Sequence, residues 1–266
     1  MHELPGPPRL LLVGDSHLMG VVDNADNAAD VLERSLRARA GLERAAVLNA
    51  SCGYYSLYQD VLRARTLLDE LAPRLLVIAV FLGNDFLELE DVGRPHLDDD
   101  GRERPTDAAP PPETTSARRR HLGLAGDDLL FWQGLNQACY FELRPERFEP
   151  VLAKAKRCIE LCEDLARGRE LQVVFALVPS YDLVFPDRAA EKNEQVAKVV
   201  RAGWNGRVRD RFRALLDERG ITVVDLVEGF RRDGRDELYA SDYHIGVEGH
   251  RQLAEALFEP AVAALK

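Results

Sequence analysis

Five short apolar runs alternate with longer amphipathic segments, and this alternation constrains the fold of the 266-residue chain more than any other feature. The runs are rich in Val, Leu and Ile, as expected of strands that are buried on both faces of a parallel sheet. They are too short and too uniformly apolar to be typical surface helices. The sequence therefore predicts five parallel strands, at residues 10–13, 45–48, 75–82, 171–178 and 221–226.

The segments between these runs carry apolar residues at intervals of three and four, the spacing of one helix face. We expect a break in the fourth helix near Gly203 or Gly206, and Gly168 is placed to end the third. Strand and helix thus alternate, which is typical of a doubly wound α/β layer structure. The sequence predicts a single domain over residues 1–266, with helices at 26–40, 56–71, 148–167, 191–219 and 249–265.

The segment from residue 88 to about 124 differs from the rest of the chain. It contains three aspartates followed by Gly101, then runs of proline, threonine and arginine, so it can bury little apolar surface. We expect a loop with a short hairpin that turns at Asp100-Gly101. A loop this long in a compact domain is usually a functional lid or disordered. The prediction is a lid-like or partly disordered insertion at about 88–147.

Charge and cysteine content narrow the function classes. The chain has 35 Lys and Arg against 45 Asp and Glu, a net charge of -10, which argues against nucleic-acid or anionic-membrane partners. No secretory signal is visible in the first residues, so we expect a cytoplasmic protein.

Cys158 and Cys162 lie one helical turn apart, but no further Cys or His has matching spacing. We expect buried cysteines, no metal and no organic cofactor.

Residues suited to acyl chemistry follow the predicted strands. Ser16 follows the first strand, Gly53 the second and Asn84 the third, while Asp242 and His244 precede the last helix. Ester hydrolysis needs a nucleophile, a base, a group that orients the base, and donors for the oxyanion. Taken singly, each has an ordinary structural explanation, such as a helix cap or a turn. Their joint occurrence at successive strand ends favours a catalytic site.

These blocks, Gly14-Asp15-Ser16, residues 49–53, Gly83-Asn84-Asp85 and residues 241–244, resemble in order and spacing those of the SGNH hydrolases, or GDSL-type esterases and lipases. The resemblance implies a flavodoxin-like, three-layer sandwich around a five-stranded parallel sheet. It further implies that Ser16 is the nucleophile, that His244 is its base and that Asp242 orients His244. The oxyanion hole would comprise the Ser16 and Gly53 N–H groups and the Asn84 amide.

Two departures from the family pattern leave alternatives open. The third block reads Gly-Asn-Asp where Gly-x-Asn-Asp is commoner, and Asp242 lies two residues before His244 where many members have it three before. The Asp-x-His form is similar to that of SGNH-type sugar O-acetyltransferases. We expect a serine esterase for small, acetyl-type esters, acting on a small-molecule or carbohydrate substrate. The alternatives are an O-acyltransferase for a sugar or secondary metabolite, and a catalytically silent binding module.

Three further polar residues lie near these blocks. Asp15 is expected to hold the turn through backbone hydrogen bonds, and His250 to have no chemical role. His17 either lines the pocket or lies at the surface; the sequence favours neither. The chain lacks Gly-x-Ser-x-Gly, which excludes the α/β-hydrolase nucleophile elbow. The oligomeric state is not predicted.

Overall fold

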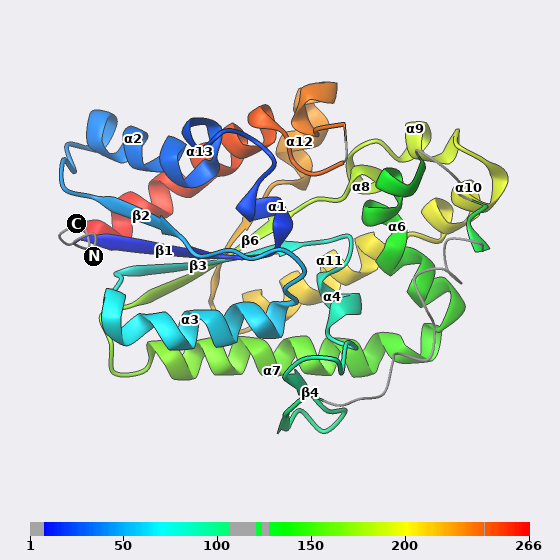
Figure 1. Cartoon of the computed structure of the whole chain (residues 1–266), viewed down its shortest axis with the longest axis horizontal. Coiled ribbons are helices and arrows are strands. Elements are labelled where there is room, and N and C mark those ends of the chain that lie inside the picture. Colours follow the sequence, from blue (N-terminus) through cyan, green and yellow to red (C-terminus); the bar gives the residue numbers. More distant parts are fainter. Residues whose placement is uncertain (1–7, 107–120, 124–127, 242) are drawn as a thin grey trace.

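A five-stranded, all-parallel sheet forms the centre of the molecule (Figure 1). The computed structural model describes residues 8–106, 121–123 and 128–266 except 242, with backbone alone at 128–133. The strand order is β2-β1-β3-β6-β7, so β1 and β3 lie near the middle. All five predicted strands are confirmed, with ends shifted by at most one residue: β1 Arg9–Val13, β2 Ala46–Asn49, β3 Leu75–Phe81, β6 Gln172–Val178 and β7 Thr222–Asp225.

Helices cover both faces of the sheet (Figure 1). On one face α3 (Leu57–Leu71), α7 (Phe148–Ala166) and α11 (Trp204–Asp217) pack against the odd-numbered side chains of β1. On the other, α2 (Ala28–Ala40) and α13 (Val247–Leu265) pack against its even-numbered side chains. Because both faces of a strand are buried, its sequence is continuously apolar, as observed. The result is the predicted three-layer α/β sandwich.

Local sequence explains where the helices begin and end. Asn27 caps α2 by accepting a hydrogen bond from the Ala29 N–H, and Ser56 with Gln59 forms a capping box at the start of α3. The predicted break in the fourth helical segment is confirmed at Gly203. This glycine has φ of 70° and separates α10 (Glu194–Ala202) from α11. A left-handed residue at this position stops the helix at little cost only when it is glycine.

The predicted hairpin is also present. Strands β4 (His96–Leu97) and β5 (Glu103–Arg104) pair antiparallel around Gly101, which has φ of 74°. Arg147 pairs with both Glu90 and Asp99, at 2.7 Å and 2.8 Å, so the hairpin is tied to the start of α7. Residues 107–120 and 124–127 of the expected insertion lie outside the described residues.

Helix α6 (Asp128–Leu143) was not predicted from the sequence. Its Gln137 side chain accepts a hydrogen bond from the Phe86 N–H at 3.0 Å and donates to the Leu82 carbonyl at 3.0 Å. Leu135, Ala138 and Cys139 are buried against α10. This part of residues 88–147 therefore packs into the body of the domain, and a lid function for the segment stays a prediction.

Short helical turns complete the described chain. Within the described residues, no helix combines the length and apolarity needed to cross a membrane. The short elements are α1 Ser16–Met19, η1 Asn24–Asp26, α4 Asp85–Glu88, η2 Pro145–Arg147, α8 Tyr181–Val184, α9 Pro186–Ala190, α12 Val227–Asp233 and η3 Asp236–Leu238.

Candidate active site

The turn after β1 holds Ser16 at the carboxyl edge of the sheet. Ser16 is the first residue of α1, and Asp15 caps this short helix by accepting a hydrogen bond from the His17 N–H at 2.9 Å. The expected structural role of Asp15 at the turn is therefore present. A Cβ at Gly14 would lie 3.0 Å from the Ala79 carbonyl oxygen, so glycine allows this turn to pass close to β3. The backbone on both sides of Ser16 is thus fixed.

The far end of α1 is anchored to neighbouring segments. The Asn27 amide donates to the Leu18 and Met19 carbonyls, each at 3.1 Å, and the Asn49 amide donates to the Leu18 carbonyl at 3.0 Å. These bonds satisfy carbonyl groups that a four-residue helix cannot satisfy internally. As a consequence α1, and with it Ser16, is held against both α2 and the end of β2.

The loop before α13 brings His244 to Ser16. The His244 Nε2 lies 2.9 Å from the Ser16 Oγ, although the two residues are 228 positions apart. The loop is a tight reversal: Tyr239 bridges Ile245, and the Ala240 N–H donates to the His244 carbonyl at 2.7 Å. His244 itself is buried, with 8% of its surface exposed. A nucleophile and base in this arrangement can exchange a proton directly.

Two glycines let α13 start directly against this loop. A Cβ at Gly246 would lie 2.7 Å from the Glu237 carbonyl oxygen, and one at Gly249 would lie 2.6 Å from the Leu238 carbonyl oxygen. Real Cβ atoms do not come this close to backbone oxygens. The Leu238 carbonyl also accepts a hydrogen bond from the Gly246 N–H at 2.8 Å. The position of His244 therefore depends on close backbone packing at the first turn of α13.

Asp242 lies outside the described residues. Its distance from His244 is therefore not tested, and its role in orienting the imidazole stays a prediction.

Gly53 lies beside Ser16. The Cys52 N–H donates to the Gly14 carbonyl at 2.9 Å, which continues the pairing of β2 with β1 to the edge of the sheet. A Cβ at Gly53 would be 3.7 Å from the Ser16 Cβ and 3.8 Å from the Met19 Cε. The second sequence block thus reaches the serine, as the predicted topology requires.

Asn84 follows β3, the neighbour of β1 on the other side. It precedes α4, and its Nδ2 donates to the Glu88 Oε1 at 2.9 Å. Because an amide nitrogen carries two hydrogens, one remains for another acceptor. Glu88 was not among the predicted site residues. Its spacing of four from Asn84, which places both on one side of a helical turn, was the signal available in the sequence.

Four carboxyl groups are buried behind the site. Burial raises the pKa of Asp15 to about 7 and that of Glu88 to about 8, and it raises the pKa of Asp60 and Asp85 well above the ordinary value. Each of Asp60, Asp85 and Glu88 is further affected by the Asp15 carboxylate, which opposes their ionisation. The raised pKa values favour the neutral form of these carboxyl groups and so reduce the negative charge near the serine.

His17 is buried, so its expected surface alternative is wrong. Its ring stacks on Phe81 with centroids 3.4 Å apart and lies 4.6 Å from the His244 ring. Burial, together with the nearby His244 and His250, lowers the pKa of His17 well below its ordinary value. The neutral ring thus lies against both Phe81 and His244, and its Nδ1 accepts a hydrogen bond from the Ile245 N–H at 3.4 Å. A partner in β3, more than sixty residues away, could not be recognised from the sequence around His17.

His250 has a structural position. Its Nδ1 accepts a hydrogen bond from the Ala28 N–H at 3.2 Å, which ties α13 to the start of α2. Burial lowers its pKa to about 4, so the imidazole is neutral near pH 7 and can accept this bond.

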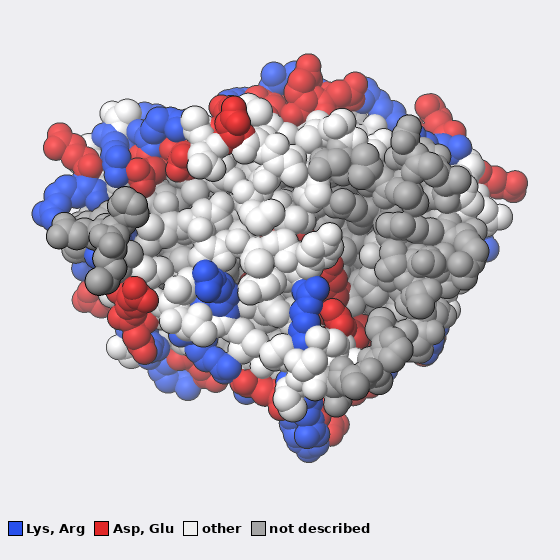
Figure 2. All heavy atoms as spheres, in the orientation of Figure 1, with Lys and Arg blue, Asp and Glu red and all other residues white. Residues whose placement is uncertain are grey.

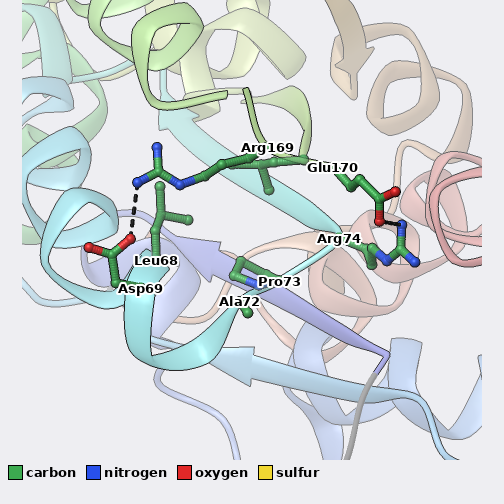
Figure 3. A pocket seen from close by; sticks show the side chains of 8 residues that line it. Leu68, Asp69, Ala72, Pro73, Arg74, Arg169 and Glu170 are labelled. Carbon is green, nitrogen blue, oxygen red and sulfur yellow. Dashed lines mark hydrogen bonds and ion pairs between the residues drawn. The ribbon is translucent and has the colours of Figure 1, made fainter. Parts of the chain in front are cut away.

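Two hollows lined by described residues do not include Ser16 in their lining. A cavity of about 410 Å³ lies before β3 and β6, where Arg169 pairs with Asp69 at 3.0 Å and Arg74 pairs with Glu170 at 2.5 Å (Figure 3). It opens at the amino edge of the sheet, opposite Ser16. A second hollow of about 510 Å³ borders the His244 loop and is lined in part by Tyr181 and Tyr243. Within the described residues, no group of three His, Cys, Asp or Glu side chains could hold a metal ion.

Comparison with known proteins extends the description of the fold. No family model and no curated protein matches the sequence. Similar solved structures include the acetyl xylan esterase AlAXEase, with a TM-score of 0.56, 13% identity and coverage of 95% of this chain and 98% of that chain. A catalytic mutant of Axe2, an acetylxylan esterase from Geobacillus stearothermophilus, has a TM-score of 0.53 at 13% identity, over 98% of this chain and 96% of that chain. TesA has a TM-score of 0.53 at 16% identity, over 97% of this chain and 99% of that chain.

The chain has the fold of these three proteins. At identities of 13–16% the likeness establishes the architecture alone. That architecture is the α/β sandwich expected of an SGNH hydrolase, and the likeness covers nearly the whole chain.

Proposed function

We propose that this protein is a serine esterase that hydrolyses carboxylic esters through an acyl-enzyme. The observation that carries the proposal is the 2.9 Å contact between the His244 Nε2 and the Ser16 Oγ at the carboxyl edge of the sheet. Ligands bind at this edge in open α/β folds. Two of the proteins with similar structures are acetyl xylan esterases, which agrees with the proposal.

The reaction follows from this pair of side chains. His244 takes the Ser16 hydroxyl proton as the oxygen adds to the ester carbonyl, and it then protonates the departing alcohol. The acyl-Ser16 intermediate is hydrolysed when His244 takes a proton from water and returns it to Ser16. The N–H groups of Ser16 and Gly53 and the free hydrogen of the Asn84 amide would bind the oxyanion in both steps. The proposed role of Asp242 is to hold His244 in the productive tautomer.

A fluorophosphonate probe and p-nitrophenyl acetate test the proposal together. We expect the probe to label wild-type protein, and Ser16→Ala and His244→Gln each to lose labelling and to lower kcat by at least about 10⁴-fold, as for serine triads. Ser51→Ala is the matched control, because Ser51 follows the neighbouring strand β2 and its hydroxyl bonds to the Asn49 side chain at 2.5 Å. Labelling that persists in Ser16→Ala, or that disappears in Ser51→Ala, would reject the assignment.

A further inference from the structure

Helix α6, which lies beside α4 (Figure 1), holds the turn that carries Asn84. The Gln137 Nε2 donates to the Leu82 carbonyl at 3.0 Å, and the Gln137 Oε1 accepts a hydrogen bond from the Phe86 N–H at 3.0 Å. The Gln137 backbone N–H donates to the Gly83 carbonyl, also at 3.0 Å. One residue of α6 thus binds backbone groups on both sides of Asn84.

Two glycines let α6 lie directly against this turn. A Cβ at Gly83 would lie 3.1 Å from the Gly134 Cα, which is tighter than an ordinary van der Waals contact. A Cβ at Gly134 would in turn lie 3.6 Å from the Ser180 Cβ, in the segment that follows β6. Helix α6 therefore contacts both the turn after β3 and the segment after β6. Because protein interiors are close-packed, a displacement of the helix would move the turn.

A buried polar network fixes the Gln137 side chain. Its Nε2 also donates to the Asn205 Oδ1 at 3.2 Å, and the Asn205 Nδ2 donates to the Asp182 Oδ1 at 3.1 Å. The same carboxylate oxygen accepts a hydrogen bond from the Ser180 hydroxyl at 2.6 Å. Gln137 and Asn205 are 0% and 1% exposed. Neither amide can rotate without leaving buried polar atoms unpaired, which is costly, so the position of Gln137 is set by its surroundings.

Neutral donors must stabilise the oxyanion at this site. Figure 2 shows Lys and Arg side chains mainly around the margin of the view and few where Figure 1 places α1, the helix that begins at Ser16. Neutral N–H groups act on an oxyanion from hydrogen-bond distance, and a catalytic donor must be held within about 0.5 Å of its productive position. The Asn84 amide meets this condition only if the turn that carries it is fixed.

We propose that Gln137 is a positioning residue for ester hydrolysis, acting through the backbone of residues 82–86 to hold the Asn84 amide where the oxyanion forms. The proposal rests on the esterase function above and extends the catalytic machinery to α6, a helix of the expected insertion. Because the Gln137 side chain is fully buried, its effect on the reaction passes through the turn rather than through contact with the substrate.

A double-mutant cycle with Asn84 tests the proposal. Gln137→Met keeps the length of the side chain and removes its two hydrogen bonds to the turn. We expect kcat for p-nitrophenyl acetate to fall by about tenfold to a hundredfold and KM to change by less than about twofold, because a donor that acts in the transition state is displaced. In the Asn84→Ala background, Gln137→Met should lower kcat no further, because the amide that it positions is absent.

Two further variants separate positioning from a loss of stability. Leu135→Ala is the matched control: Leu135 lies on the same helix and is buried against α10, away from the turn, so the protein should lose stability but keep kcat within about twofold. Urea denaturation shows that each variant is folded under assay conditions. Gln137→Glu has nearly the same shape and retains an acceptor for the Phe86 N–H. It should show a smaller fall in kcat and the same dependence on Asn84, and it carries the cycle if Gln137→Met does not fold.

The outcomes distinguish this proposal from the esterase function. If no ester is hydrolysed, or if Ser16→Ala remains active, the esterase function itself fails. If the wild type is active but Asn84→Ala or Gln137→Met keeps the wild-type kcat, the positioning role is overturned and the function stands. The role is also overturned if Gln137→Met lowers kcat by the same factor with and without the Asn84 amide. The same holds if Leu135→Ala lowers kcat as much as Gln137→Met does.

Discussion

Gly249→Ala changes the free energy of unfolding through two opposing effects, a gain in helix propensity and a steric clash, in the helix that supports His244. Alanine in a helix interior is favoured over glycine by about 1 kcal/mol, and less near a helix end. Against this, the new methyl group would lie 2.6 Å from the Leu238 carbonyl oxygen and 3.0 Å from the Ile245 Cβ. Forcing a methyl group into filled space costs about 1–3 kcal/mol, and a backbone carbonyl cannot rotate away as a side chain can. We therefore expect a net loss of about 2 kcal/mol.

Gly206→Ala is the matched control for this substitution. Gly206 occupies the third position of α11, as Gly249 does in α13. Among the described residues, a Cβ there would meet only the Leu183 Cδ2, at 3.9 Å. This variant should gain up to about 1 kcal/mol, because only the helix propensity changes. Urea denaturation measures both free energies of unfolding. In a chain of this size a 2 kcal/mol loss corresponds to a fall in Tm of about 4–8 °C.

Catalytic activity gives a second measure of the effect of Gly249→Ala. The Leu238 carbonyl belongs to the loop that carries His244, so relief of the clash must move that loop. We expect kcat for p-nitrophenyl acetate to fall by about tenfold or more in Gly249→Ala, since displacements of about 1 Å are costly in catalysis, and to stay at the wild-type level in Gly206→Ala. If both variants are equally stable and equally active, the close packing of α13 against the loop does not position His244.

Three further predictions concern the polar residues around Ser16. Asn84→Ala should lower kcat for p-nitrophenyl acetate by about 10²–10³-fold, as loss of an oxyanion donor does; a change below about twofold would remove Asn84 from the mechanism. Glu88, whose burial raises its pKa to about 8, becomes negative beside Asn84 above that pH. The pH–rate profile of the wild type should therefore decline above about pH 8, and that of Glu88→Gln should not; parallel profiles would contradict this. Burial raises the pKa of Asp60 well above its unfolded value, so its stabilising contribution is present at low pH and is lost as the pH rises. Asp60→Asn should thus gain stability over the wild type in urea denaturation between pH 5 and pH 9, and a difference that is constant with pH would refute the reasoning.

The sequence predicted the layers because burial on both faces leaves a strong local signal. The run at 75–82 is continuously apolar since every residue of β3 is buried. Gly203 ended a helix where its composition indicated a break. The rule that carboxyl ends of parallel strands share one edge led to the prediction that Ser16, Gly53 and Asn84 lie at the same edge. The pairing of Ser16 with His244 was expected from the family resemblance, and the strand order was not predicted.

Features that depend on distant partners were not predictable in the same way. Helix α6 lacks a clear apolar stripe in its sequence, because it contacts neighbours on several sides and Gln137 is buried among backbone groups. The burial of Asp60 and His17 is likewise invisible locally, since a polar residue in an amphipathic pattern is normally taken as exposed. Tertiary contacts, rather than any local signal, decide these positions.

The 228-residue separation between the proposed nucleophile and its base has a consequence for synthesis. As the chain leaves the ribosome, β1 and Ser16 appear first, but the imidazole arrives only with the loop before α13. That loop keeps its shape only once the final helix has docked against α2 and the end of η3. The serine would therefore stay inert while the 228 positions that separate it from His244 are being synthesised, and its reactivity would begin only when α13 docks.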